Sequence, residues 1–373
     1  MFGLAAASVC ALTEGARPEM RDFIGLNGHT VQFKPELYRP VCRLVRDYHP
    51  VEWDLGTNTS ELPHFPLAKN GVDWSEVYGS WRARGWSVDS CLMFETVKQP
   101  EWHDLQADAR AYGRAFAREF GPSGKRRSVS SVEIGNEPGK WSDAQYSLVF
   151  TALAQGVREG DPKMTIATCN ATTGTSGDYE KSVACVEKHP DLFDVLSVHT
   201  YAQLQNWPTW RRSFPEDPRL PHYLQDVEAV CHWRDAHAPG KPVWVTEFGY
   251  DSTTKPAETK GDFSRWVGVT DTQQAQWLVR SLLVFSAMPV ERAYIQEYQD
   301  ALKQTIWVAW SPTREGRRFS TVLARAPGRL TGAQRMPLDA EEPAADPTVR
   351  EIEEHRLEVT IDESPLYLLF EPR

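Results

Sequence analysis

The segment Val132–Pro138 has the sequence Val-Glu-Ile-Gly-Asn-Glu-Pro, a short apolar run followed directly by polar residues and a proline. A second segment, Val243–Gly249, has the sequence Val-Trp-Val-Thr-Glu-Phe-Gly and the same design. Each has a glutamate, Glu137 or Glu247, where the apolar run stops. Both segments therefore predict a buried strand with a carboxylate at its carboxyl end.

Strands of this kind recur along the chain and alternate with amphipathic stretches. The predicted strands are Phe23–Leu26, Val51–Leu55, Ser87–Phe94, Val129–Ile134, Met164–Thr168, Phe193–Val198, Pro242–Thr246 and Arg292–Ile295. The predicted helices are Pro35–Asp47, Trp74–Arg84, Asp104–Phe120, Ser142–Glu159, Tyr179–Lys188, Pro221–His237 and Thr270–Ala287. Eight such units predict an α/β fold, a (β/α)8 TIM barrel. The alternative, a doubly wound open sheet, needs a Gly-rich turn leading into a helix, whereas Gly25–Gly28 leads into an extended run.

The alternation of strand-like and helix-like segments ends at about Asp300. Short strand-like runs at Thr305–Trp310, Phe319–Ala324, Arg356–Ile361 and Leu366–Phe370 are separated by Pro, Gly and charged residues, among them an acidic loop at Ala340–Pro347. We therefore predict a catalytic barrel over residues 22–300 and a small antiparallel, sandwich-like β module over residues 301–373.

Residues 1–21 form an N-terminal segment with an Ala-rich apolar stretch, Phe2–Leu12. The stretch is compatible with the remnant of a secretory leader, although no positive region precedes it. The alternative is a short structural helix. Because strand eight is followed closely by the β module, the barrel has no room for its eighth helix, and Phe2–Leu12 would cover the apolar gap.

Composition excludes several classes of protein. Hydrophobic residues make up 41% and charged residues 25%, which is ordinary globular usage. A net charge of -10 argues against a nucleic-acid partner. No apolar run approaches the ~20 residues of a membrane span, which predicts a soluble protein. The six cysteines are scattered, which favours buried free thiols over a disulfide framework, and secreted, periplasmic and cytoplasmic locations all stay open.

In a barrel of this kind the active site lies at the carboxyl ends of the strands. Strands four and seven face each other across the barrel, so Glu137 and Glu247 can converge on one bond. Glycosidic cleavage needs such a pair, one carboxyl to protonate the leaving oxygen and one to attack the anomeric carbon. The other candidates at the strand ends, all expected to bind substrate, are His29, Trp53, Asp54, Glu95, Asn136, Asn170, His199, Tyr201 and Tyr298.

The Asn-Glu-Pro at strand four and the Thr-Glu-Phe-Gly at strand seven resemble clan A of the glycoside hydrolases. The closest similarity is to families 39 and 5, and the motif Glu-Ile-Gly-Asn-Glu-Pro also resembles family 79. The resemblance implies a retaining mechanism with Glu137 as acid/base and Glu247 as nucleophile. It also implies that Asn136 binds the sugar 2-hydroxyl and that His199 and Tyr201 line the site.

The sequence departs from the clan pattern at two strands. Many members carry an Arg at the end of strand two, where this chain is expected to have Trp53-Asp54, and a Trp at strand eight, where Tyr298 stands. These differences concern the subsite for the attacked sugar.

Tryptophans follow several predicted strands and can stack on pyranose rings or pack loops onto the barrel. They are Trp53, Trp102, Trp207, Trp210 and Trp266, of which Trp207 and Trp210 join the substrate-binding candidates. They favour an oligo- or polysaccharide substrate; the sugar, the linkage and the oligomeric state stay open.

Two other functions remain as alternatives. A metal-dependent barrel enzyme would use Glu95 and Glu137 but wants a third acid at strand five, where Asn170 stands. A non-catalytic carbohydrate-binding barrel would be expected to lose one carboxylate of the pair. We therefore expect a glycosidase that needs no metal and no other cofactor.

Overall fold

The computed structural model describes residues 19–30, 33–252, 264–296, 305–309, 318–324, 326, 328–335, 348–353, 356–361 and 365–371. The chain divides into two compact units. The first comprises Met1–Val269 and Trp277–Glu297, and the second comprises Thr270–Gln276 and Tyr298–Arg373.

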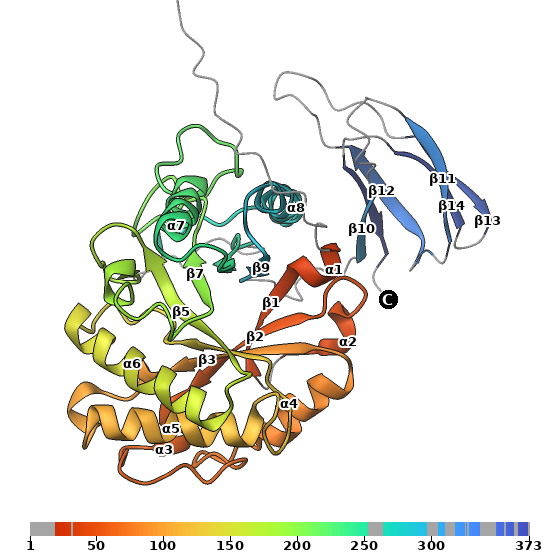
Figure 1. Ribbon diagram of the computed structural model, residues 1–373. Coiled ribbons are helices and arrows are strands. Elements are labelled where there is room, and N and C mark those ends of the chain that lie inside the picture. Colours follow the sequence, from red (N-terminus) through yellow and green to blue (C-terminus); the bar gives the residue numbers. More distant parts are fainter. Residues whose placement is uncertain are drawn as a thin grey trace, which may run out of the picture. The chain divides into compact units, whose positions relative to one another are not determined.

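The first unit is built on a closed barrel of eight parallel strands, seen at the centre of Figure 1. In chain order the strands are β1 (Ile24–Gly28), β2 (Leu44–Pro50), β3 (Ser87–Met93), β4 (Ser131–Ile134), β5 (Thr165–Thr172), β7 (Val195–His199), β8 (Val243–Phe248) and β9 (Arg292–Ile295). Strand β1 pairs with both β2 and β9, and β4 pairs with β5, which closes the ring. The predicted TIM barrel is confirmed.

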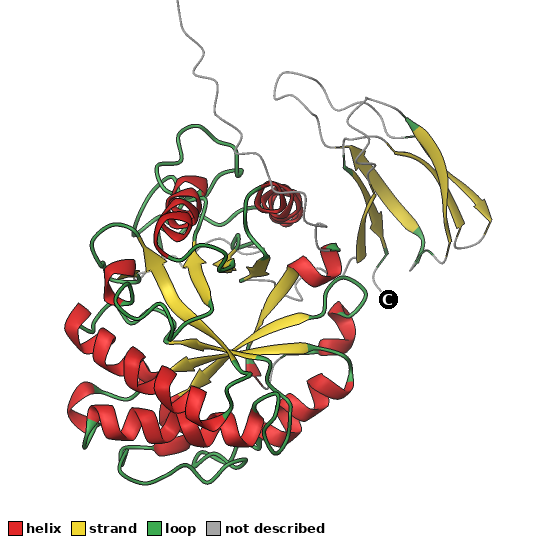
Figure 2. Ribbon diagram, in the orientation of Figure 1, coloured by secondary structure: helices red, strands yellow, loops and turns green. Residues whose placement is uncertain are grey.

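Helices surround the strands, as the colours of Figure 2 show. They are α4 (Trp74–Ala83), α5 (Leu105–Phe120), α6 (Asp143–Gly160), α7 (Leu224–His237) and α8 (Asp271–Ala287), with the short helices α1 (Met20–Phe23), α2 (Pro35–Tyr38) and α3 (Val51–Leu55) near the start of the chain. Their starts follow local chemistry. The side chain of Asp104 accepts a hydrogen bond from the backbone N–H of Ala107, and Ser142 and Gln145 form a capping box at α6.

Helices α5 and α6 approach each other closely through glycine. A Cβ at Gly156 would lie 2.1 Å from the carbonyl oxygen of Arg110, and one at Gly113 would lie 2.6 Å from that of Leu153. Alanine at either position would push the two helices apart. The glycines therefore fix this pair of helices against each other, one on each side of β4, the strand that precedes Glu137 in the chain.

The barrel interior is apolar at one level and charged at the next. A cluster of buried residues fills its lower layer: Leu44, Ala167, Val195, Trp244 and Tyr294. One pleat further along β2, Arg46 is fully buried and binds Glu133 of β4. The apolar layer therefore supports a charged layer that lies toward the carboxyl ends of the strands.

The prediction for strand two is wrong. Val51–Leu55 forms helix α3, and strand β2 occupies Leu44–Pro50, partly inside the predicted helix Pro35–Asp47, of which only α2 forms. The charged residues of β2 obscured its strand pattern. They are buried in pairs, Arg46 with Glu133 inside the barrel and His49 with Asp54 outside it.

The predicted helix Tyr179–Lys188 is also wrong. This segment contains β6 (Lys181–Ser182) and a short 3-10 helix, Val183–Cys185. Lys181 is buried, and its ammonium group donates to the carbonyl oxygens of Gly139 and Trp141. The segment is therefore shaped by the loop that follows Glu137.

In its described residues the second unit has two antiparallel sheets of three strands each. One has the order β10 (Thr305–Ala309), β15 (Leu366–Phe370), β12 (Leu330–Arg335); the other has the order β11 (Phe319–Ala324), β14 (Arg356–Ile361), β13 (Val349–Glu353). Leu357 and Val359 of the second sheet share a buried cluster with Leu366, Leu368 and Phe370 of the first. The predicted C-terminal β structure is present, with two strands, β12 and β13, that the sequence did not indicate.

The N-terminal stretch Phe2–Leu12 and the acidic loop Ala340–Pro347 lie outside the described residues, so their predicted roles stay predictions. Cys42, Cys91, Cys169, Cys185 and Cys231 are free and buried. None of the helices in the described part of the chain has the length and apolarity to cross a membrane.

Candidate active site

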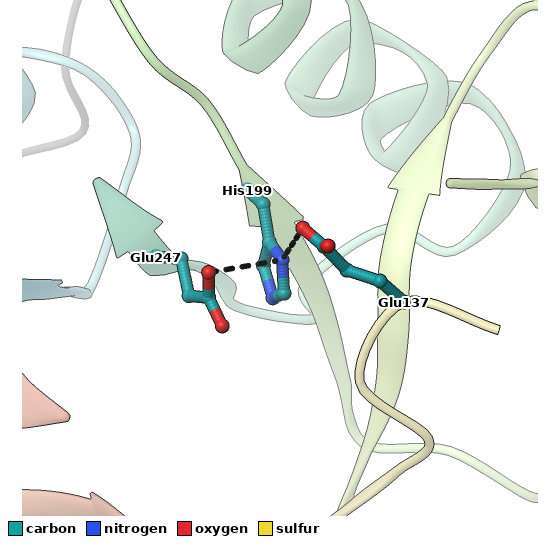
Figure 3. A group of neighbouring side chains, drawn as sticks. All are labelled: Glu137, His199 and Glu247. Atoms are coloured by element: carbon teal, nitrogen blue, oxygen red, sulfur yellow. Dashed lines mark hydrogen bonds and ion pairs between the residues drawn. The ribbon is translucent and has the colours of Figure 1, made fainter. Parts of the chain in front are cut away.

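Glu137 and Glu247 lie on either side of His199, as Figure 3 shows. Glu247 belongs to β8, His199 ends β7, and Glu137 follows β4 after a turn at Gly135. One carboxylate oxygen of each glutamate and one ring nitrogen of His199 all lie within 4.8 Å of one another. The two carboxylates therefore face one small space at the carboxyl end of the barrel.

The turn before Glu137 requires glycine. Gly135 has φ +83, and a Cβ there would lie 2.7 Å from the ring of Phe94. The next residue, Asn136, donates its backbone N–H to Glu95 Oε1 over 2.8 Å. Strand, turn and backbone anchor together direct the side chain of Glu137 over the end of the barrel.

His199 joins the two carboxylates electrostatically. Its Nδ1 lies 3.0 Å from Glu137 Oε1 and 3.6 Å from Glu247 Oε2, and its Nε2 lies 3.6 Å from Glu133 Oε1. Burial alone lowers the pKa of His199, but the charge of Glu247 and the interactions with Glu133 and Glu137 outweigh burial and raise this pKa to about 9. At neutral pH the ring of His199 is therefore positively charged.

Glu247 is held by four side chains. Arg46 Nη1 donates to its Oε1 over 3.0 Å, and the hydroxyl of Tyr48 donates to the same oxygen over 2.7 Å. The hydroxyl of Tyr201 donates to Oε2 over 2.8 Å. Burial works to raise the pKa of Glu247, but His199, Arg46 and the two hydroxyl groups together lower it. Glu247 is therefore a buried carboxylate that keeps its charge.

Arg46 is the centre of this charged layer. Its guanidinium group donates to Glu133 through Nε and Nη2, at 2.9 and 2.8 Å, and to the side-chain oxygens of Asn27 and Asn136, both at 2.8 Å. Four residues of this layer were not predicted as site residues from the sequence: Arg46, Glu133, Asn27 and Tyr48. A signal existed for Glu133, a single charge inside the apolar strand pattern of β4.

The departure noted at strand two is therefore wrong. The chain does have an arginine on its second strand, Arg46, and it contacts Glu247 directly. Trp53 and Asp54 belong to helix α3 instead. Asp54 is buried outside the barrel, where its carboxylate accepts from Trp74 and Tyr112 and lies 2.7 Å from His49 Nε2. Trp53 stacks on Trp74.

Glu95 lies behind the turn of Asn136 and does not line the cavity. Burial raises its pKa to about 7, against the opposing effect of backbone hydrogen bonds from Glu95, Asn136 and Glu137. It supports the backbone of the site. His29, after β1, stacks on Tyr48 with 5.3 Å between ring centroids. Burial lowers the pKa of His29, and the charge of Glu247 partly opposes this effect.

A cavity of 790 Å³ opens over the paired glutamates. Its wall contains most of the residues predicted from the sequence: Glu137, Asn170, His199, Tyr201, Trp207, Trp210 and Glu247, together with Trp266. Asn170 fixes the end of β7, because its Oδ1 accepts the backbone N–H of His199. Trp102 is buried in the core, and Tyr298 lies outside the described residues.

The three tryptophans form one wall of the cavity. Trp207 and Trp210 lie 6.4 Å apart by ring centroids, and Trp210 and Trp266 lie 6.1 Å apart. Trp207 is half exposed. Carboxylates of Asp178, Glu180 and Asp226 also line the cavity. The site thus offers aromatic faces and hydrogen-bonding groups next to the paired glutamates.

Glu137, His199 and Glu247 are close enough together to be considered as ligands for a metal ion. Their electrostatic surroundings oppose this use. The pKa of His199 is raised to about 9, so its ring is charged at neutral pH, and the guanidinium of Arg46 lies 3.0 Å from Glu247. A cation would have to displace a proton and lie beside a fixed positive charge. The donor set fits acid–base chemistry better than metal binding.

A barrel with two facing carboxylates at the carboxyl ends of its strands has the arrangement that glycoside hydrolases use. The family model for Cellulase (glycosyl hydrolase family 5) matches residues 98–310, which is more than half of the chain. The chain belongs to glycosyl hydrolase family 5 and is thereby a glycosidase. The match supports one of the resemblances noted in the sequence; those to families 39 and 79 stay predictions.

Solved structures share the fold at low sequence identity. CelM2, a bifunctional glucanase-xylanase from a metagenome library, aligns with a TM-score of 0.51 and 11% identity over 94% of this chain and 96% of its own. A glucosidase from Croceicoccus marinus aligns with a TM-score of 0.54 and 17% identity over 74% of this chain; the match spans 60% of the glucosidase. The endoglucanase Cel5A from Pseudomonas stutzeri aligns with a TM-score of 0.50 and 13% identity over 73% of this chain and 85% of its own.

Proposed function

We propose that the protein hydrolyses O-glycosidic bonds of an oligo- or polysaccharide with retention of anomeric configuration. Glu247 is the nucleophile and Glu137 is the acid/base. The observation that carries this proposal is that two carboxylates whose oxygens lie within 4.8 Å of each other have different surroundings. Retaining enzymes need carboxyl groups about 5 Å apart, whereas inverting enzymes keep them roughly 6.5–9.5 Å apart to admit a water molecule.

In the first step Glu137 protonates the glycosidic oxygen while Glu247 attacks the anomeric carbon. The aglycone leaves as an alcohol, and the sugar is bound to Glu247 as an ester. Arg46, Tyr48 and Tyr201 support this assignment because they aim hydrogen-bond donors at the Glu247 carboxylate before substrate arrives. A preorganised carboxylate needs little rearrangement to attack.

In the second step Glu137, now ionised, takes a proton from water, and the resulting hydroxide equivalent attacks the same carbon. The ester breaks and Glu247 is released as a carboxylate. Ester formation has removed the negative charge on Glu247, while the charged His199 still lies 3.0 Å from Glu137. His199 is then the side chain that orients the Glu137 carboxylate toward the attacking water.

The tryptophan wall supports an extended glycan as substrate. Trp207, Trp210 and Trp266 present aromatic faces along one side of the cavity, and pyranose rings stack on such faces. Asn136 is held by Arg46, close to Glu247, and is assigned to the sugar 2-hydroxyl. His29, beside Tyr48, and Asn170, in the cavity wall, complete the substrate-binding set.

The test is to incubate the protein with a panel of glycans that begins with cellulose and other plant polysaccharides and to follow the first product by proton NMR. We expect the newly formed reducing end to have the anomeric configuration of the bond that was cleaved. Initial formation of the opposite anomer would contradict retention. Binding of a glycan without cleavage would contradict catalysis and favour a carbohydrate-binding barrel.

A further inference from the structure

Arg212 lies in the long connection between β7 and α7, close to the nucleophile but without contact to it. It is buried, and its guanidinium group makes three kinds of contact. Nη1 donates to the carbonyl oxygen of Gly249 over 2.8 Å, and Nη2 donates to Asp251 Oδ2 over 3.0 Å. The Cζ atom of the group lies over the Tyr201 ring, 4.2 Å from the ring centre.

Two of these contacts hold the end of the nucleophile strand. Gly249 and Asp251 are the second and fourth residues after Glu247. Asp251 is itself tied to the next segment, because its carbonyl oxygen accepts the N–H of Val269 over 2.8 Å. Arg212 therefore links the β7–α7 connection to the backbone immediately after Glu247.

The third contact bears on the nucleophile itself. Tyr201 donates its hydroxyl to Glu247 Oε2 over 2.8 Å, and the guanidinium of Arg212 covers one face of the Tyr201 ring. A flat, charged group on that face limits rotation and tilt of the ring. The hydroxyl is thereby held on one carboxylate oxygen.

Arg212 also lies at the end of the loop that contains the tryptophans. Residues 203 and 212 form an antiparallel bridge, and Ser213 donates its N–H to the carbonyl of Ala202. Between these pairs lie Trp207 and Trp210, the latter at φ +48. Arg212 therefore fixes both the loop that contains the tryptophans and the Tyr201 side chain whose hydroxyl binds Glu247.

We propose that Arg212 is a positioning residue that holds the Tyr201 hydroxyl on Glu247 and joins the tryptophan wall to the nucleophile strand. This inference rests on the proposed function of Glu247. Arg212 acts through Tyr201, so loss of Arg212 and loss of the Tyr201 hydroxyl should produce the same chemical defect. A glycan stacked on Trp207 and Trp210 then stabilises the same arrangement that prepares the nucleophile.

The experiment compares kcat/KM across pH for wild type, Arg212→Met, Tyr201→Phe and the double variant, on the best glycan of the panel. We expect Arg212→Met to lower kcat/KM by about 10- to 100-fold. The acidic limb of its profile of kcat/KM against pH should move to higher pH by the same amount as in Tyr201→Phe. The double variant should be no worse than the more impaired single variant, because both changes remove one interaction.

Arg280→Met is the matched control. Arg280 also covers an aromatic ring, that of Phe214 at 5.0 Å, and pairs with Glu216, but it makes no contact with Tyr201 or Glu247. This variant should leave the acidic limb in place. If Arg212→Met fails to fold, Arg212→Lys takes its place in the experiment. Lysine keeps the charge but lacks the flat face and the two parallel donors of arginine. The acidic limb should therefore move in the same direction, by less.

An unchanged acidic limb in the folded Arg212 variant, or additive losses in the double variant, would overturn the inference. Inactivity of the wild type on every glycan would instead count against the proposed function. The two failures are thus distinguishable.

Discussion

Glu247 and Glu137 face the same histidine but lie in different surroundings. The side chain of Glu247 is 6% exposed and accepts hydrogen bonds from Arg46, Tyr48 and Tyr201. The side chain of Glu137 is 25% exposed, and its contact with His199 is the one side-chain interaction found for it among the described residues. A nucleophile must stay charged and still, whereas an acid/base must exchange protons with substrate and water. This difference supports the proposed roles of the two glutamates.

The surroundings of the two glutamates also differ in how they are built. Those of Glu247 come from strand β2, from the end of β7 and from the segment just after β7, all of which are far from Glu247 in the sequence. Glu137 depends on its own turn, on Gly135 and on the anchor at Glu95. Substitutions around Glu247 should therefore alter its charge state, and those around Glu137 should alter proton transfer.

The largest effect is expected from Glu247→Gln. This change keeps the shape but removes the attacking charge, so no glycosyl-enzyme can form. We expect kcat to fall on the order of 10⁵- to 10⁶-fold, as when a nucleophile is removed elsewhere. Glu180→Gln, which alters another acid of the same cavity, is the control and should stay within about tenfold of wild type. A Glu247→Gln variant as active as this control would end the assignment.

Glu137→Ala should give the next largest effect, and its size should depend on the substrate. With a poor leaving group we expect a loss of roughly 10²- to 10⁴-fold in kcat/KM, because proton donation is lost. With an activated aryl glycoside the first step needs no acid, and azide should restore turnover by attacking the glycosyl-enzyme. Steady-state rates with both substrates, with and without azide, make the test. Equal losses for both leaving groups would assign another role to Glu137.

Arg46→Met should weaken the surroundings of the nucleophile without removing it. Because Arg46 helps to lower the pKa of Glu247, the acidic limb of kcat/KM should move to higher pH. At neutral pH we expect a loss of about 10²- to 10³-fold. Glu133 would be left buried without its arginine partner, so the free energy of unfolding should fall by roughly 3–5 kcal/mol. Arg110→Met, at an exposed pair with Glu159, is the control and should change neither quantity appreciably. If the acidic limb does not move, Arg46 does not lower the pKa of Glu247.

The smallest effect concerns the stability of the fold at alkaline pH. The folded pKa of His199, about 9, lies above its ordinary value of 6.5. Its protonation therefore stabilises the fold fully below pH 6.5, and this contribution is lost as pH rises through 9. The difference in unfolding free energy between wild type and His199→Asn, measured by denaturant titration, should shrink between these pH values. A difference that stays constant with pH would mean that the ring is neutral throughout.

The two decisive strand ends could be predicted because their signals are local. The motifs around Glu137 and Glu247 each fit within seven residues, and strand alternation gave the barrel and the order of most elements. Strand β2 could not be recognised, because Arg46, Asp47 and His49 look like residues of a solvated helix. Their burial depends on partners far away in the sequence; Glu133, for example, is 87 residues from Arg46. Asp54 was misassigned for the same reason, since its partners Trp74 and Tyr112 lie on α4 and α5.

The most direct test of the two roles is to identify the residue that becomes glycosylated. The Glu137→Ala variant, supplied with an activated aryl glycoside, should accumulate the covalent intermediate, since attack by water is then slow. Proteolysis and mass spectrometry would locate the added sugar. We expect a mass increase of one glycosyl unit on the peptide containing Glu247, and on Glu247 itself after fragmentation. A sugar on any other residue, or turnover of this variant with no covalent intermediate under rapid quenching, would contradict it.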